Sequence, residues 1–75
     1  MRRRDEEITR RILKLVYRKP VGLTIEEVSR ELKINRTTAS RHLDVLELRR
    51  QVLVRELGQS KLHYPKTRRV ESWLR

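Results

Sequence analysis

The sequence predicts a single, mainly α-helical domain in which three helices are followed by a small β-hairpin and a short C-terminal helix. Up to about residue 50, apolar side chains recur every three or four residues, which is the period of an amphipathic helix. After residue 51 this period changes to short apolar and alternating runs around a glycine turn, which is typical of a hairpin. The length of 75 residues leaves room for one domain.

The first helix is predicted over residues 5–19, after a flexible basic arm at residues 1–4. Its apolar stripe consists of Ile8, Ile12, Leu15 and Val16. Because proline and glycine interrupt helices, the Pro-Val-Gly sequence at residues 20–22 should end this helix and form a turn.

The next two helices are predicted from their start signals. Thr24 and Glu27 have the spacing of a capping box, so a helix should begin after Thr24 and run to about residue 32. A short turn follows over residues 33–35, and Asn35 is a favourable N-cap for a helix over residues 36–49. The apolar stripe of this third helix consists of Ala39, Leu43 and Leu46, with His42 at its edge, packed there or bonded to the backbone.

The hairpin is predicted from two strands, residues 52–54 and 61–64, joined by a turn at residues 57–60. Alternation along the second strand places Leu62 and Tyr64 inward and His63 outward, where it could touch phosphate. Pro65 should end this strand, and Thr67 is a candidate cap for a last short helix. The predicted domain therefore spans residues 5–67, and residues 68–75 form a helical extension.

The charge of the chain points to a polyanionic partner. The net charge is +10 and the isoelectric point is near 11.3. Residues 32–69 carry ten bases against three acids, so most of the excess lies in the second half of the chain. Such a balance favours nucleic acid first and an anionic membrane second. No apolar run is long enough to span a bilayer, and a membrane partner is not expected.

Two short helices joined by a tight turn, with a basic and polar outer face on the second, are the signature of a helix-turn-helix. With the hairpin as a wing, the predicted fold is a winged helix-turn-helix. The outer face of the third helix, away from its apolar stripe, carries Thr37, Ser40, Arg41 and Asp44, with Arg36 at its N-terminal edge. Arginine can bind guanine with two hydrogen bonds, and hydroxyl groups reach phosphates or base edges. This face is therefore a candidate for a major-groove contact.

Residues 32–43, LKINRTTASRHL, followed by Leu46-Glu47, resemble the core of winged-helix regulators of the ArsR and MarR type, especially archaeal ones. The Leu-His-Tyr sequence at residues 62–64 resembles the end of their wing, and the resemblance covers about residues 8–67. It implies DNA contacts from the third helix and from the wing. The candidate DNA-binding residues are Asn35, Arg36, Thr37, Ser40, Arg41, Arg55, Gln59, Ser60 and Lys61.

The sequence departs from this family at two turns, which leaves their geometry open. Glycine often stands in the family where this chain has Lys33, and again near Arg50 and Gln51. Many ArsR-type proteins sense metals through cysteines, but this chain has none, so no metal site or cofactor is expected. No catalytic constellation is visible, so an enzyme is not expected, and no small-molecule effector is evident.

A homodimer is expected because the terminal helices carry more apolar surface than one small core needs. The candidate interface residues are Leu13, Tyr17, Val70, Trp73 and Leu74. In the family that the chain resembles, terminal helices often pair the subunits, which implies the same here. The alternative is a monomer whose C-terminal helix folds back onto its own first helix.

The function predicted from these features is sequence-specific binding of double-stranded DNA by a transcription regulator, located in the cytoplasm with the nucleoid. Nonspecific binding as a basic chromatin-type protein is an alternative within the same class. RNA binding and a winged helix used only for protein contacts are two further alternatives. The aromatic content of 4% disfavours single-stranded RNA, which proteins usually read by stacking. The target sequence, the effector and the sign of regulation are left open.

Overall fold

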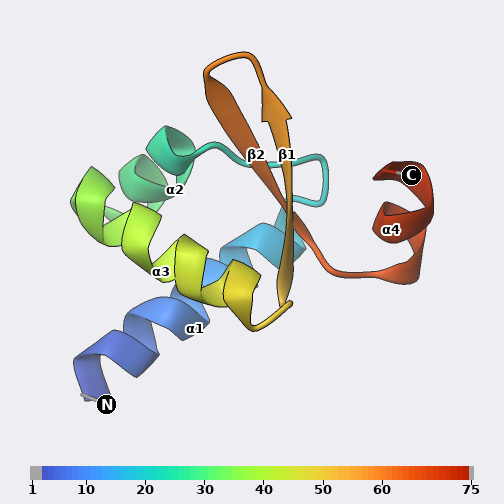
Figure 1. Cartoon of the computed structure of the whole chain (residues 1–75). Helices are drawn as coiled ribbons and strands as arrows, with labels where there is room; N and C mark the ends of the chain where they lie inside the picture. Colours follow the sequence, from blue (N-terminus) through green and yellow to red (C-terminus); the bar gives the residue numbers. More distant parts are fainter. Residues whose placement is uncertain (1–2, 75) are drawn as a thin grey trace.

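A computed structural model describes residues 3–74 and shows four helices and one antiparallel hairpin (Figure 1). The elements follow the predicted order, which confirms the fold class of three helices, a two-stranded wing and a short C-terminal helix. They are α1 (Arg3–Arg18), α2 (Ile25–Leu32), α3 (Arg36–Leu48), β1 (Val52–Leu57), β2 (Ser60–Pro65) and α4 (Arg68–Leu74).

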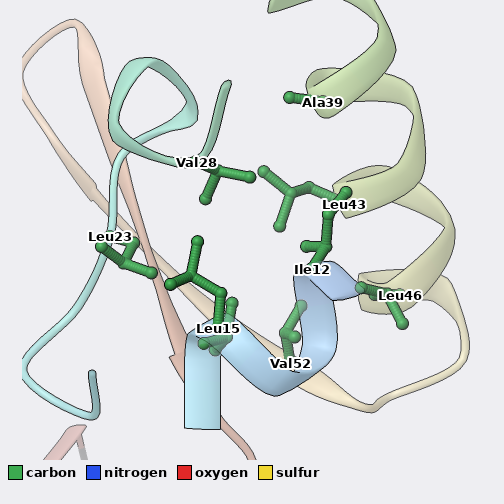
Figure 2. Packing of buried hydrophobic residues seen from close by; sticks show 9 residues of the cluster. Ile12, Leu15, Leu23, Val28, Ala39, Leu43, Leu46 and Val52 are labelled. Carbon is green, nitrogen blue, oxygen red and sulfur yellow. The ribbon is translucent and has the colours of Figure 1, made fainter. Parts of the chain in front are cut away.

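The core lies where α1, α2, α3 and the start of the hairpin meet (Figure 2). Its apolar side chains are spaced along each helix as the periodicity predicts, and their burial supplies most of the driving force for folding. Ile8 and Leu13 are only partly buried at its margin. The buried members are Ile12, Leu15, Val16, Leu23, Val28, Ala39, Leu43, Leu46 and Val52.

The helix α1 begins at Arg3, two residues before the predicted start, so Arg3 and Arg4 belong to the helix rather than to a flexible arm. Residues 1–2 of the predicted arm lie outside the described residues. The acidic side chains of Asp5 and Glu6 lie in the first turn, where they oppose the positive end of the helix dipole. Arginine is also a good helix former, which favours the additional residues.

The predicted N-caps of α2 and α3 are confirmed. The amide of Glu27 donates to Thr24 Oγ1 at 3.1 Å, and the amide of Thr24 donates to Glu27 Oε1 at 2.9 Å, which completes the capping box of α2. At the start of α3, the amide of Thr37 donates to Asn35 Oδ1 at 2.7 Å. These bonds satisfy backbone groups that have no partner inside the helix, and so they fix where α2 and α3 begin.

Within residues 3–74, left-handed backbone occurs at two residues that are not glycine. Lys33, which ends α2, has φ 55°, and Arg50, which follows α3, has φ 58°. At these two turns, the winged-helix regulators that the sequence resembles often have glycine. The turns therefore keep the left-handed geometry without the residue that adopts it most easily, and each carries a conformational cost.

The expected outward position of His63 is wrong. The strands β1 and β2 pair from Val52↔Pro65 to Leu57↔Ser60, and Leu23 forms an additional antiparallel bridge with His63 on the other edge of β2. The base of β2 is therefore flanked on both edges, and His63 is only 3% exposed. Tyr64 and Pro65 are also buried, so the base of β2 is covered on both of its faces. The alternation of inward and outward side chains therefore fails in this part of the strand.

Candidate nucleic-acid interface

The helix α3 presents its predicted polar face to solvent. Ala39, Leu43 and Leu46 are buried against the rest of the core. Arg36, Thr37 and Arg41 are exposed on the outer side, and Ser40 is half-buried between the two sides. Because the apolar stripe anchors the helix, the outer face is held in one orientation and its side chains remain available to a ligand.

A groove of about 280 Å³ lies between α3 and the tip of the hairpin. It brings together residues that are far apart in the sequence and that were separate candidates. From α3 it is lined by Arg36, Ser40 and Asp44, and from the hairpin by Gln59, Ser60, Lys61 and His63. Thr24, Ile25 and Glu26 from the start of α2 complete the lining. Five of the candidate DNA-binding residues therefore share one concave surface.

The other candidates lie elsewhere on the surface. Arg55 pairs with Leu62 across the hairpin, whereas Lys61 pairs with Glu56. Because directly paired residues share a face and successive residues alternate, Arg55 and Lys61 lie on opposite faces of the wing. Thr37 is exposed at the start of α3 outside the groove lining, and Asn35 is occupied as an N-cap.

Two acidic residues in the groove were absent from the candidate set. Glu26 Oε1 lies 3.6 Å from Arg36 Nη1, but both side chains are more than 60% exposed, so this ion pair holds Arg36 only weakly. Asp44 follows Arg36 and Ser40 at intervals of four residues and so lies on the same helix face. A carboxylate there repels phosphate and can accept from the amino group of cytosine. The sequence had already placed Asp44 on the outer face of this helix, but not among the DNA-binding residues.

His63 occupies the floor of this groove. Its Nδ1 donates to the carbonyl oxygen of Leu23 at 3.0 Å, because a carbonyl can only accept. Burial lowers the pKa of His63 below 6.5, and this outweighs the opposing effects of the Leu23 hydrogen bond and of the carboxylates of Glu47 and Asp44. The ring is thus a neutral structural element at neutral pH, and its Nε2 is the remaining acceptor.

A second hollow of about 480 Å³ lies on the other side of α3, against the N-terminal half of α1. Thr9 Oγ1 and His42 Nδ1 are joined by a hydrogen bond of 2.8 Å across this contact, so His42 bonds a side chain rather than the backbone. Arg41 lines this hollow and not the groove beside the wing. The helix α3 is therefore a ridge between two depressions.

The candidate dimer residues divide into buried and exposed members. Val70 is only 4% exposed and is used by the fold of the single chain. Leu13 and Leu74 are half-buried, while Tyr17 is 47% and Trp73 63% exposed. The rings of Trp73 and Tyr64 meet edge to face with centroids 5.9 Å apart, which attaches α4 to the base of β2. Figure 1 shows α4 beyond the three-helix core, at the end of β2.

Two properties of the described residues bear on other kinds of site. Between residues 3 and 74, every helix is too short or too polar to cross a membrane. Over the same residues, no three side chains of histidine, cysteine, aspartate or glutamate are grouped as they would be around a metal ion.

Comparison with known proteins supports a shared fold and a family. Residues 5–50, more than half of the chain, match the model of a family described as a helix-turn-helix domain. Among curated proteins, no sequence matches the chain.

Two solved structures are similar to the chain over most of its length. Reduced HlyU from Vibrio cholerae N16961 has a TM-score of 0.71 and 21% identity, with 89% of this chain and 68% of that chain covered. NolR from Sinorhizobium fredii has a TM-score of 0.66 and 17% identity, with 84% and 61% covered. The present chain therefore spans less than two thirds of NolR. Both are winged-helix transcriptional regulators of the ArsR/SmtB type, and at these identities the likeness shows a common fold.

Proposed function

Because the chain belongs to the helix-turn-helix domain family, we propose that it is a transcription regulator that binds double-stranded DNA through α3 and the wing. The observation that carries this proposal is the groove in which Arg36 and Ser40 of α3 meet Gln59, Ser60 and Lys61 of the hairpin. A helix beside a projecting hairpin can contact a duplex at the major groove and at the adjacent backbone.

The dimensions and chemistry of α3 support a major-groove position. The helix has 13 residues and is therefore about 20 Å long, and the major groove is about 12 Å wide, enough to admit a helix. Arg36 and Arg41 are exposed and can reach guanine or phosphate, while Thr37 and Ser40 offer short hydroxyl groups. Sequence specificity follows from Arg41 and Asp44, because a guanidinium and a carboxylate prefer different bases.

The wing is proposed to contact the backbone rather than the bases. Gln59, Ser60 and Lys61 are exposed and lie next to Gly58, which forms the turn with φ 61°. Lys61 supplies a flexible positive charge and Ser60 a hydroxyl donor, both of which suit phosphate oxygens. Such contacts add affinity for any duplex and position α3 without reading the sequence.

We further propose a symmetric homodimer formed by the C-terminal end of α1 and by α4. Tyr17 and Trp73 are the large aromatic side chains that stay exposed on these helices, and aromatic residues are enriched at interfaces. Two copies of α3 would then contact half-sites about one DNA turn, or ~34 Å, apart, and the site would be a near-palindrome. The protein would act in the cytoplasm, on the nucleoid.

Nonspecific DNA binding is the second candidate function, and one observation favours it. Residues 10–19, which include most of the exposed face of α1, contain five bases and no acid. A duplex could contact this face through phosphate alone, as a chromatin-type protein would require. The two candidate functions predict different ratios between the affinity for the selected duplex and the affinity for random duplex. One set of titrations measures this ratio.

The proposed function is tested by selecting bound duplexes from a random pool. The selected duplex is then titrated against a random duplex and a single strand at several salt concentrations. A regulator should select a near-palindrome and bind it at least about 1,000-fold more tightly than random duplex. Equal affinity for all duplexes would instead identify the chromatin-type function. Preference for the single strand would refute both.

A further inference from the structure

The exposed face of α1 is a second basic surface, separate from the groove beside the wing. We propose that this face holds a second duplex segment through its phosphates, so that one chain can bridge two segments of DNA. The contact between α1 and a phosphate backbone stands on its own charge pattern, whereas bridging rests on the proposed function of α3. Bridging goes beyond both candidate functions, because each of them needs only one duplex.

The positive charges on this face form a continuous line, called here the basic stripe. Arg10, Lys14 and Arg18 follow one another at intervals of four residues, and Arg11 lies beside them, so all belong to one side of the helix. All four side chains are exposed, and within residues 3–74 none of them forms an ion pair. From Arg10 to Arg18 the stripe is about 12 Å long, a length over which duplex DNA carries about seven phosphate charges.

The stability of α1 does not explain the basic stripe. Like charges four residues apart destabilise a helix, and Arg10–Lys14 and Lys14–Arg18 are two such pairs. Arg18 lies in the last turn and gains from the helix dipole, but Arg10 and Lys14 lie before that turn, where the dipole has little effect. Glu6 and Glu7 precede Arg10 and offset the repulsion only at that end. A face that is merely solvated would alternate acidic and basic side chains along its length. The stripe therefore indicates a polyanionic partner.

The basic stripe and the outer face of α3 lie on different sides of the molecule. Ile12 and Val16 of α1 belong to the same buried cluster as Leu43 and Leu46 of α3, so each helix turns its opposite side to solvent. In Figure 1, α1 lies at the bottom and the tip of the hairpin at the top. A straight duplex held by α3 and the wing therefore would not reach the stripe, and bending it around the protein costs free energy. A second duplex segment can contact the stripe without this cost.

Burial of the apolar side of α1 argues against a lipid bilayer as this partner. An amphipathic helix binds a membrane by inserting its apolar face among the headgroups. In α1 that face is formed by Ile12, Leu15 and Val16, which are at most 3% exposed because they pack in the core. Among the large apolar side chains that the structure describes in α1, only Tyr17 is exposed. The surface left for a partner is charged with little apolar area, which suits a phosphate backbone.

Bridging is tested with two duplexes and the intact chain. The selected duplex is fixed to beads and saturated with protein, and retention of a fluorescent random duplex is measured at several salt concentrations. Arg10→Gln/Lys14→Gln should leave binding to the fixed duplex unchanged. It should weaken binding of the second duplex about tenfold and reduce the salt slope by about two. Arg49→Gln/Arg69→Gln removes the same charge from exposed positions outside α1 and should change neither binding event. Glutamine is a good helix former, so the variants should fold.

A homodimer offers another route to bridging, through its two copies of α3. Trp73→Ala, which is expected to be monomeric, should therefore still retain the second duplex. Loss of the second duplex in Trp73→Ala, together with retention in Arg10→Gln/Lys14→Gln, would assign bridging to the dimer and overturn the proposal.

Three other results would also overturn the role of the basic stripe. Equal losses in the two double variants would reduce the effect to net charge. If Arg10→Gln/Lys14→Gln lost binding to phosphatidylserine vesicles but kept the second duplex, the stripe would belong to a membrane contact. Binding to the fixed duplex without retention of the second would refute this inference alone, whereas failure to bind the fixed duplex would refute the proposed function.

Discussion

His63 Nδ1 lies 3.0 Å from the carbonyl oxygen of Leu23, and the two residues are also joined by a pair of backbone hydrogen bonds. The backbone bonds measure 3.0 Å from Leu23 N to His63 O and 2.8 Å from His63 N to Leu23 O. This triple contact ties the wing to the segment that leads into α2. Because the groove beside α3 is bounded by both elements, its shape depends on this connection.

Stability should decrease as the pH falls through the mildly acidic range. The pKa of His63 is lowered in the folded state, so protons bind more readily to the unfolded chain. The contribution of His63 to the free energy of unfolding is therefore fully present above the unfolded pKa of about 6.5, and it is lost as the pH falls below that value. Urea unfolding at about pH 7.5 and about pH 5.5 measures this loss, which should be smaller in His63→Gln. An equal loss in the variant would assign the effect to other groups.

Specific recognition should depend on Arg41. If the side chain binds guanine with two hydrogen bonds, Arg41→Ala should weaken binding of the selected duplex by about 1–3 kcal/mol and of random duplex less. Arg49→Ala, which removes an exposed arginine just after α3 and outside both depressions, is the matched control. Equal losses on both duplexes would mean that Arg41 contacts phosphate rather than a base. No loss on either duplex would mean that Arg41 does not contact DNA.

The two faces of the wing should differ in their contribution to nonspecific affinity. Lys61 lines the groove, whereas Arg55 lies on the opposite face of the hairpin. Removing a phosphate contact lowers the dependence of log K on log salt by about one unit, so Lys61→Ala should show this change on every duplex. Arg55→Ala should show a smaller one. An unchanged slope in the double variant would mean that the hairpin does not contact DNA.

Glycine at Lys33 should stabilise the protein. The left-handed backbone at φ 55° costs a residue with a side chain about 1–2 kcal/mol. Glycine avoids this cost, but its greater freedom in the unfolded chain offsets part of the stabilisation. Lys33→Gly should therefore raise the free energy of unfolding by about 0.5–1 kcal/mol, measured by urea denaturation.

Gly22→Ala is the opposite case and serves as a control. Here φ is 107°, and an added Cβ would lie 2.9 Å from the Tyr64 ring. This substitution should destabilise the protein. Destabilisation by Lys33→Gly as well would contradict the assignment of strain to that turn.

The oligomeric state is expected to depend on Trp73. Analytical ultracentrifugation of the intact chain at tens of micromolar should give a dimer, because Trp73 is 63% exposed on the proposed interface. Trp73→Ala should shift the equilibrium to monomer, while Leu48→Ala removes an 83% exposed apolar side chain from the end of α3 and should not. A monomeric intact chain that binds a single half-site one to one would refute the dimer.

The amino-acid sequence alone determined the elements whose signals are local. The capping residues Thr24 and Asn35 act within one turn of their own helices, and the stripe of α3 depends only on helical period, so each could be predicted. The family resemblance implied DNA contacts on α3, and these contacts stay a prediction. Such signals need no knowledge of what lies across the core.

Tertiary structure decided what depends on two or more distant segments. His63 is buried because Leu23, forty residues earlier, pairs with the free edge of β2, and the alternation of one strand carries no sign of that neighbour. The hollow between α1 and α3 exists because Thr9 and His42 are brought together by packing of the core. Arg55 and Lys61 lie on opposite faces because of the register in which β1 pairs with β2. A shift of this pairing by one residue would move the side chains of one strand to the other face of the hairpin.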